Sequence, residues 1–433
     1  MLSPLDDRYI GKIEDITNHF SNFNFTRYKL FIEIQYFKFI TQILDSDNTE
    51  IDRENIELLT NFTKEDYNRI NELEKKTNHD IQALIDFIKS KNIIEHTQWI
   101  HFGLTSQDIN SPSMVLMYRD FNDTIFKEDI NLLLNNIKNI QNQYGSINML
   151  TFTHGQPATP SNFNYQFEVY ASKIRHVYTD IFKNYTYRTK VGGSNGQLTS
   201  LKMIYPHLDW NKLFDDFTAE NFFLERNKYT TQIDDYSNYF KLFQIYERLC
   251  FILIDLCQDI WLYCHRKYIL LKNVSGEVGS SAMPHKINPI QFENAEGNLK
   301  LSASLFNSIG TSISVSRLQR DLTDSTMLRN VGVAVGHMML SIRNINTGLQ
   351  RIMVNKDKCL LDINDNKTIL MEFYQLLLRK WNIQDGYNLC KEFSRSKQNI
   401  NTQEFIEYLE SKNIELSENR IIEIENIEKN ICN

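Results

Sequence analysis

Apolar residues along this chain recur at alternating intervals of three and four, which is the spacing of one face of an α-helix. The longest unbroken series consists of Leu328, Val331, Val335, Met338, Ile342, Ile345, Leu349 and Ile352. This pattern is typical of a helix in a coiled-coil-like bundle, which needs neighbouring helices along its whole length. Similar series begin at Leu242 and, more briefly, at Leu30.

The most apolar segment, Phe240 to Leu271, carries four charged residues: Glu247, Arg248, Asp255 and Asp259. Because these charges exclude a bilayer span, we predict one long buried helix here. Only 15 Gly and 7 Pro interrupt the 433 residues, which favours long helices over many short strands. The pattern therefore predicts an all-α protein, built as an elongated bundle of long helices.

Helix-breaking residues fall into four clusters. They are Gly103 with Pro112; Gly155, Pro157 and Pro160; Gly192, Gly193 and Gly196; and Gly276, Gly279, Pro284 and Pro289. Each cluster borders polar sequence, and binding groups tend to lie on loops that a rigid scaffold holds, so we expect the chemistry there. We divide the chain into an N-terminal helical domain of residues 1–108, a central long-helix domain of residues 109–345 and a C-terminal helical domain of residues 346–433.

Composition limits the classes of partner. The net charge is −7 and the acids and bases are interleaved, so we expect neither nucleic acid nor a membrane surface as a partner. Cys250, Cys257 and Cys264 recur every seventh residue, too far apart on a helix to form disulfides, and are expected to be core residues. The polar start, Ser3 to Arg8, does not resemble a signal peptide, and a cytoplasmic location fits both observations.

The segment from Gly276 to Pro289 carries the most distinctive chemistry. Its glycines let the backbone approach a ligand, and the helix start at Pro289 can bind an anion. Lys286 adds a positive charge, Asn288 adds an amide, and hydroxyls come from Ser280 and Ser281. The alternative is an ordinary connector followed by a helix cap.

The string Gly-Ser-Ser-x-Met-Pro-x-Lys-x-Asn-Pro within this segment resembles the signature loop of the fumarase and aspartase superfamily, and its His285 variant resembles the adenylosuccinate lyase branch. Six other segments resemble that family in the right order: Arg8-Tyr9, Thr77 to Asp80, Thr105 to Asp108, Thr153 to Pro160, Thr230 to Ile233, and Arg320 to Arg329. The C-terminal segment carries no comparably specific motif. The resemblance implies β-elimination of fumarate from adenylosuccinate and from the succinyl-carboxamide imidazole nucleotide, without a cofactor.

Such an elimination needs a base for a carbon acid, an acid for the leaving nitrogen and clamps for carboxylates. The resemblance implies that Ser280 is the base, acting as an alkoxide that Lys286 helps to stabilise, with Ser281 as the adjacent alternative. It implies that His154 is the general acid, since imidazole titrates near neutral pH. Glu293 is expected to pair with His154 and fix its tautomer; alternatively, it is an exposed first-turn carboxylate.

Arginine suits a phosphate because its guanidinium presents a fork of donors. The resemblance implies phosphate contacts for Arg8, Tyr9, Arg320, Ser325 and Arg329. It implies further ligand contacts for Asn78, His79, Asp80, Thr105, Ser106, Thr153, Gln232, Ser281, Ile287, Asn288 and Asn294. Gln107 stands where the family often has Glu, and residues 192–196 follow the family's glycine loop only loosely. No metal-site spacing of histidines and no G-x-G-x-x-G motif occurs, so we expect neither metal nor cofactor.

Two alternatives remain. One is another fumarate-releasing lyase, such as argininosuccinate lyase, aspartase or fumarase, whose substrates lack a nucleotide phosphate. The other is a helical scaffold that has lost the chemistry, which intact Ser280, Lys286, His154 and Glu293 oppose. The resemblance also implies a homotetramer with a twenty-helix core, in which three chains build each site and His154 and Ser280 come from different chains. The apolar series from Leu328 fits such a partner interface.

Overall fold

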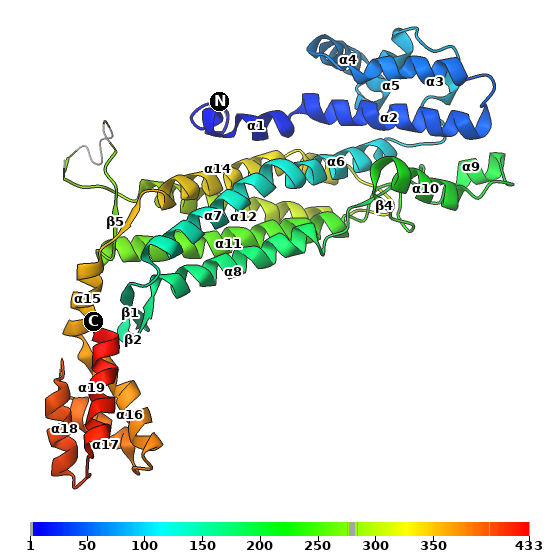
Figure 1. The fold of residues 1–433 in the computed structure, drawn as a ribbon. Helices are drawn as coiled ribbons and strands as arrows, with labels where there is room; N and C mark the ends of the chain where they lie inside the picture. The colour runs from blue at the N-terminus through cyan, green and yellow to red at the C-terminus, as the bar shows by residue number, and fades with distance from the viewer. Residues whose placement is uncertain (1–2, 275, 277–281, 284, 398, 433) are drawn as a thin grey trace. The chain divides into compact units, whose positions relative to one another are not determined.

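The computed structural model describes residues 3–274, 276, 282–283, 285–397 and 399–432 (Figure 1). The prediction of a mostly helical protein is confirmed, with 68% of the described residues in helices. Six short strands form three two-stranded sheets within the described residues. The chain divides into two compact units: unit 1 comprises residues 1–131, 176–254 and 297–343, and unit 2 comprises residues 132–175, 255–296 and 344–433. The proposed three-domain division stays a prediction.

The N-terminal part of unit 1 consists of one long helix, α2, and several shorter ones. They are α1 (Ile10–His19), α2 (Asn22–Leu44), α3 (Glu50–Ile56), η1 (Glu57–Thr60), α4 (Lys64–Thr77), α5 (Asp80–Ser90), η2 (Thr97–Trp99), α6 (Gln107–Phe121) and the π-helical turn η3 (Asn122–Phe126). Local chemistry sets several of their starts. The Ser21 side chain caps α2, and Thr63 and Asp66 form a reciprocal capping box at α4.

The remaining short elements of unit 1 fall in two stretches of the chain, residues 188–226 and 323–328. They are β3 (Arg188–Thr189), α9 (Thr199–Ile204), α10 (Trp210–Phe222), β4 (Glu225–Arg226) and α13 (Thr323–Leu328). Strands β3 and β4 are parallel. Buried aromatic side chains of α10 pack against aromatic side chains of α2, where Phe39 and Phe217 have ring centroids 4.6 Å apart. This apolar packing holds α10 on the N-terminal helices of its unit.

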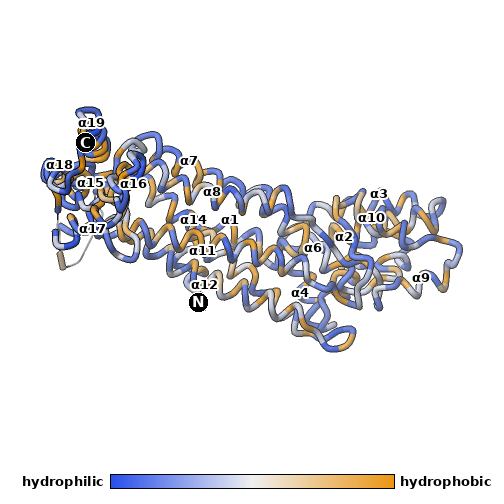
Figure 2. Tube along the Cα trace, turned by 90° about the horizontal axis from the view of Figure 1, so that it is seen from below, coloured by the Kyte–Doolittle hydropathy of each residue, from blue (hydrophilic) through white to orange (hydrophobic). Residues whose placement is uncertain are grey.

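Five long helices contribute residues to both units. They are α7 (Lys127–Tyr144), α8 (Phe163–Phe182), α11 (Ser237–His265), α12 (Ile290–Ile313) and α14 (Val331–Leu349). Polar pairs between neighbouring helices, each within one unit, are Arg248–Asp180, Lys173–Asp255, Gln258–Glu296, His337–Asn298, Asn344–Asn294 and Asn136–Asn346. Along α8 the paired residues run from Lys173 to Asp180, while their partners on α11 run back from Asp255 to Arg248. These two helices are therefore antiparallel. Apolar and polar positions alternate along the long helices, as Figure 2 shows.

Unit 2 adds two pairs of short strands and a set of C-terminal helices. Its further elements are β1 (Asn148–Thr153), β2 (Gln156–Asn162), β5 (Ile269–Leu271), β6 (Ile352–Val354), α15 (Lys356–Asp365), η4 (Lys367–Leu370), α16 (Met371–Lys380), α17 (Gly386–Ser394), α18 (Thr402–Ser411) and α19 (Glu418–Cys432). Both strand pairs, β1 with β2 and β5 with β6, are antiparallel. The first of them presents the predicted acid His154.

Two helix predictions were wrong at their ends. The expected helix from Phe240 to Leu271 ends at His265, because Lys267 adopts a left-handed conformation (φ +62°) and the last three residues pair with β6. The apolar series from Leu328 to Ile352 likewise spans α13, α14 and β6. Pro112, expected to break a helix, lies inside α6. In the first two cases the apolar pattern continues beyond the end of the helix, so spacing alone did not show the boundary.

The apolar series of α14 is buried within this single chain, from 2% exposure at Val331 to 0% at Met338, Ile342 and Ile345. Its burial therefore gives no argument for a partner chain. Cys250 and Cys257 are buried thiols and Cys264 is half-buried, which confirms the prediction for the first two. None of the helices in the described part of the chain combines the length and apolarity that a bilayer span requires.

Candidate active site

The residues singled out by the sequence belong to both units. Unit 1 holds Arg8, Tyr9, Asn78, His79, Asp80, Thr105, Ser106, Gln232, Arg320, Ser325 and Arg329, and unit 2 holds Thr153, His154, Lys286, Ile287, Asn288, Glu293 and Asn294. Ser280 and Ser281, the expected base and its neighbour, lie outside the described residues. Each set is described within its own unit.

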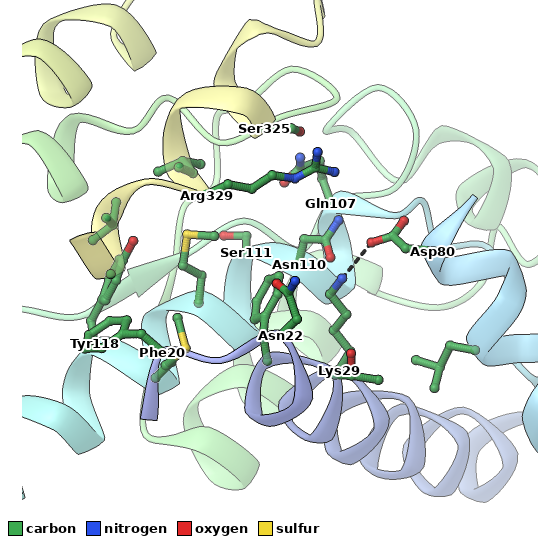
Figure 3. Close-up of a pocket in the computed structure, with 18 of the residues that line it drawn as sticks. Phe20, Asn22, Lys29, Asp80, Gln107, Asn110, Ser111, Tyr118, Ser325 and Arg329 are labelled. Atoms are coloured by element: carbon green, nitrogen blue, oxygen red, sulfur yellow. Dashed lines mark hydrogen bonds and ion pairs between the residues drawn. The ribbon is translucent and has the colours of Figure 1, made fainter. Parts of the chain in front are cut away.

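A cavity of about 410 Å³ opens in unit 1 between α2, α4, α5, α6 and α13 (Figure 3). Three of the predicted contacts line it: Asp80, Ser325 and Arg329. The structure thus brings together groups that lie more than two hundred residues apart in the sequence. Arg8, Tyr9, His79, Arg320 and Gln232 are not among the residues that line this cavity.

Lys29 and Asp80 form an ion pair at the edge of the cavity. Lys29 Nζ lies 2.6 Å from Asp80 Oδ2, and the two side chains point toward one another in Figure 3. Burial acts to raise the pKa of Asp80, but the charge and the hydrogen bond of Lys29 outweigh it, so that the pKa lies below its ordinary value. Asp80 is therefore an anion that holds Lys29 on the cavity wall.

His79 caps the N-terminus of α5. Its Nδ1 accepts the backbone N–H of Gln82 at 3.2 Å, and its Nε2 lies 3.4 Å from Ser106 Oγ. In the neutral ring this leaves the proton on Nε2, facing the Ser106 hydroxyl. The helix start thus brings together two predicted ligand contacts, and half of the His79 side chain remains exposed (51%).

A buried ion pair ties the Thr105 segment to the glycine loop. Asp108 Oδ1 lies 2.6 Å from Lys190 Nζ, and both side chains have 0% exposure. The same carboxylate accepts the backbone N–H groups of Thr105, Gly192 and Gly193. Burial lowers the pKa of Lys190, and the Asp108 charge opposes that shift only in part. Residues 192–196, which follow the family pattern only loosely, are thus fixed by contacts that the motif did not show.

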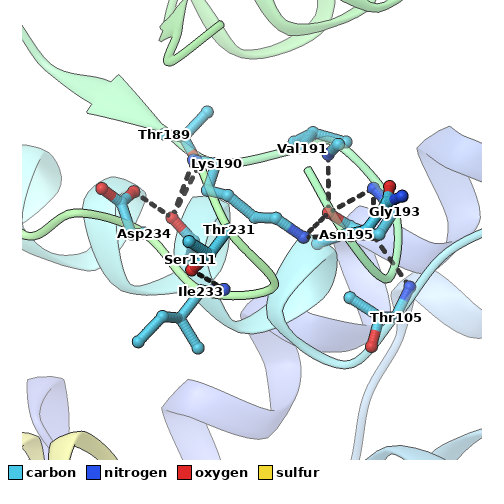
Figure 4. A network of polar contacts seen from close by, with 12 residues as sticks. Thr105, Ser111, Thr189, Lys190, Val191, Gly193, Asn195, Thr231, Ile233 and Asp234 are labelled. Atoms are coloured by element: carbon cyan, nitrogen blue, oxygen red, sulfur yellow. Dashed lines mark hydrogen bonds and ion pairs between the residues drawn. The ribbon is translucent and has the colours of Figure 1, made fainter. Parts of the chain in front are cut away.

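Thr189, Ser111 and Asp234 extend this set of contacts, as Figure 4 shows. Ser111 Oγ donates to Asp234 Oδ2 at 3.0 Å and accepts the backbone N–H of Lys190 at 3.0 Å. Burial raises the pKa of Asp234 to about 6. Because Ser111 also lines the cavity, the buried network reaches the cavity wall.

In unit 2, His154 occupies the tip of the β1–β2 hairpin. Thr153 pairs with Gln156, so His154 and Gly155 form a two-residue turn, and both have positive φ, +54° and +73°. Two positive φ values are typical of a type I′ turn, which suits the twist of a hairpin. The His154 side chain is exposed, and its ring forms no hydrogen bond with the described part of the chain.

Glu293 lies in the first turn of α12. Its Oε1 accepts the indole N–H of Trp261 at 3.0 Å, and the Trp261 ring stacks on His265 with an interplanar angle of 4°. Among the described contacts of this chain Glu293 does not meet His154, so their pairing stays a prediction. The neighbouring Asn294 accepts a hydrogen bond from Asn344 Nδ2 at 2.7 Å.

The segment before α12 is exposed around its predicted lysine. Lys286 and Ile287 are exposed, whereas Asn288 is half-buried. The backbone N–H of Lys286 donates to the Met283 carbonyl at 3.0 Å, and the Pro289 carbonyl accepts the N–H of Glu293 at 3.1 Å. Pro289 thus stands at the start of the helix, as the sequence predicted.

Comparison with known proteins covers nearly the whole chain. A family described as lyase matches residues 40–301, and the family described as adenylosuccinate lyase C-terminal matches residues 316–429. The adenylosuccinate lyase of Dictyostelium discoideum is 36% identical over 408 residues, which cover 91% of this chain and 88% of that protein. The chain belongs to the adenylosuccinate lyase family. The adenylosuccinate lyase of Escherichia coli K12 is 33% identical over 92% of this chain and 89% of its own length.

Membership of the adenylosuccinate lyase family confirms the resemblance of the motifs and extends it to the C-terminal segment, where no motif had been found. The fold agrees with that of the solved fumarate lyase from Mesorhizobium sp. BNC1, with a TM-score of 0.73 and 16% identity over 96% of this chain and 94% of the other. At that identity the likeness speaks for the fold alone.

Several polar residues around the site were missed. They are Lys29, Asn110, Ser111 and Tyr236 in the cavity wall, Asp324, which accepts the Tyr236 hydroxyl, and Trp261 beside Glu293. Lys29 could have been found, because it and Glu33 stand four residues apart on the buried face of α2. Charged residues on an apolar helix face are rare unless they are paired.

Proposed function

We propose that this member of the adenylosuccinate lyase family removes fumarate from adenylosuccinate, giving AMP, and from the succinyl-carboxamide imidazole nucleotide. The observation that carries the proposal is the 36% identity to an adenylosuccinate lyase over 91% of the chain. The polar cavity with an arginine, a lysine and several amides supports a nucleotide as the ligand.

In the proposed reaction, Ser280 as an alkoxide, or Ser281 as the alternative, takes a proton from the carbon next to one succinyl carboxylate. The electron pair of that C–H bond forms the double bond of fumarate, and the C–N bond breaks. His154 donates a proton to the leaving nitrogen. An exposed imidazole at a hairpin tip suits this role, because a rigid turn presents it to a ligand without a competing hydrogen bond.

The phosphate of the nucleotide is proposed to bind Arg329 and Ser325, with Arg8, Tyr9 and Arg320 as further contacts. Ser325 and Arg329 line one wall of the cavity in Figure 3, and they are four residues apart, so they lie on the same side of a helical turn. The other predicted contacts are proposed to bind the base, ribose and carboxylates.

We also propose that the active enzyme is a cytoplasmic homotetramer whose sites are shared between chains, with a twenty-helix core. Two findings support a shared site. The exposed His154 ring has no partner among the described residues, and the Glu293 carboxylate contacts Trp261 rather than His154. A second chain can supply the Glu293 that His154 lacks, so that the acid and its orienting group meet across an interface.

A substrate panel tests the proposed reaction. Purified protein should release fumarate from adenylosuccinate and from the imidazole nucleotide, and from neither argininosuccinate, aspartate nor malate. Fumarate from one of the latter three, with none from adenylosuccinate, would favour another lyase of the superfamily. A folded protein that releases no fumarate from any of them would favour a scaffold.

A further inference from the structure

Tyr236 joins two buried aspartates. Its backbone N–H donates to Asp234 Oδ1 at 3.2 Å, and its hydroxyl donates to Asp324 Oδ2 at 2.5 Å. Tyr236 and Asp234 are each 2% exposed, and Asp324 is 5% exposed. A buried carboxylate without a donor is costly, so the Tyr236 hydroxyl is part of what holds Asp324 in place.

The backbone of Tyr236 supports a fixed orientation of its side chain. The residue has φ +56°, in the left-handed region that bulky side chains disfavour. Such a conformation persists only when the surroundings over-determine it. Here the two hydrogen bonds to Asp234 and Asp324 hold the residue at both its backbone and its hydroxyl.

The Asp234 end of this chain of contacts is firmly fixed. Asp234 accepts Ser111 Oγ at 3.0 Å and Asn227 Nδ2 at 3.0 Å. Figure 4 shows Asp234 and Ser111 facing one another beside Lys190. Tyr236 is therefore anchored on one side, through Asp234, to α6 and to the segment that follows β4, both of which belong to unit 1.

The Asp324 end leads to the cavity. Asp324 lies in the first turn of α13, and its Oδ1 accepts the backbone N–H of Ser325 at 2.7 Å. The contact from Ser325 Oγ is longer, 3.3 Å, so this hydroxyl can rotate toward a ligand. Arg329 follows at the end of the same short helix. The placement of Asp324 thus decides where Ser325 and Arg329 face.

We propose that Tyr236 is a positioning residue for phosphate recognition: its hydroxyl holds Asp324, and through Asp324 it holds α13 so that Ser325 and Arg329 meet a nucleotide phosphate. Tyr236 borders the cavity, but its hydroxyl is committed to Asp324. This inference rests on the proposed function for the identity of the ligand, and it adds a residue that no motif contained.

The test compares two tyrosines of the same region. Tyr236→Phe removes the hydroxyl from Asp324. Tyr246→Phe is the matched control, because Tyr246 is 1% exposed and donates its hydroxyl to Asn122 Oδ1 at 2.7 Å instead. Binding of AMP is measured by calorimetry for wild-type protein, each variant, Arg329→Ala and the double variant Tyr236→Phe with Arg329→Ala.

We expect Tyr236→Phe to weaken AMP binding about 3- to 10-fold, the effect of one lost hydrogen bond, while Tyr246→Phe changes it by less than about two-fold. In the Arg329→Ala background, Tyr236→Phe should add less than about two-fold, because the arginine it positions is already absent. KM for adenylosuccinate should follow AMP binding, with kcat nearly constant.

AMP affinity unchanged in Tyr236→Phe, or equal losses with and without Arg329, would overturn the positioning role. If Tyr236→Phe does not fold, Asp324→Asn takes its place, since it keeps the side-chain size and replaces one acceptor oxygen by a donor. Wild-type protein that neither binds AMP nor releases fumarate would refute the proposed function instead, so the two failures are distinguishable.

Discussion

Lys190 Nζ lies 2.6 Å from Asp108 Oδ1, and neither side chain has any exposed surface. Burying an ion pair costs desolvation of both charges, and removing one partner leaves the other charge buried alone. The loss of one member alone is therefore expected to destabilise the fold strongly, even though the intact pair adds little net stability. The pair also joins the Thr105 segment to the glycine loop, which lie 85 residues apart at Asp108 and Gly193.

Asp108→Asn should lower the free energy of unfolding by about 3–5 kcal/mol, because it leaves Lys190 as an unpaired buried cation. Urea denaturation followed by circular dichroism measures this. Asp255→Asn is the control, since Asp255 pairs with Lys173 at a surface where the side chains are 50% and 44% exposed. Its effect should stay within about 0.5 kcal/mol. Equal small losses in both variants would show that the buried pair is not needed.

Asp234 should make stability depend on pH. Burial raises its pKa to about 6, from an ordinary 3.8. Between these values the folded state holds a proton that the unfolded chain has lost, so this carboxyl stabilises the fold fully below about pH 4 and loses that contribution as pH rises through 6. Relative to Asp234→Asn, the free energy of unfolding of wild-type protein should therefore fall by about 2–3 kcal/mol from pH 4 to pH 7. A difference that stays flat over this range would contradict the raised pKa.

Arg329→Ala should reduce kcat/KM for adenylosuccinate about 10- to 150-fold. This range corresponds to the loss of about 1.5–3 kcal/mol, the typical contribution of a hydrogen bond to a charged group. The melting temperature should hardly change, because the Arg329 side chain is exposed. Arg317→Ala is the control, as Arg317 is 82% exposed and forms a local ion pair with Asp321, four residues away. Normal kinetics together with a lowered melting temperature would make Arg329 a structural residue.

A shared site predicts complementation. His154→Ala and Ser280→Ala should each lose most of the activity, and mixed tetramers formed after mild dissociation and reassembly should regain part of it, because some sites then receive both native groups. Wild-type protein carried through the same treatment shows that reassembly works. Verified mixed tetramers that stay inactive would mean that both groups come from one chain.

The helices could be predicted well because apolar periodicity is local and repeats over many turns. The end of α11 could not be, since Ile269 to Leu271 continue the apolar pattern but are captured by pairing with β6, more than eighty residues away. The His154 turn was likewise expected as a loop, and its hairpin depends on which strands meet. Pro112 is accommodated inside α6 against the usual preference of proline.

The candidate site divides in the same way. Motif residues such as Asp80, Ser325 and Arg329 could be selected from resemblance, and the structure shows that they share a cavity. The contacts that hold them could not be predicted, because each is one long-range hydrogen bond: 51 residues separate Lys29 from Asp80, and 88 separate Tyr236 from Asp324. A single sequence contains no local pattern for such pairs.

The most direct measurement follows fumarate and AMP together after adenylosuccinate is added to purified protein, with His154→Ala in parallel. We predict the two products in equal amounts from wild-type protein, and a rate lower by about 10²- to 10⁴-fold in the variant, whose circular dichroism spectrum and melting temperature match wild type. Unequal products, or an unchanged rate in a folded His154→Ala variant, would contradict elimination with His154 as the acid.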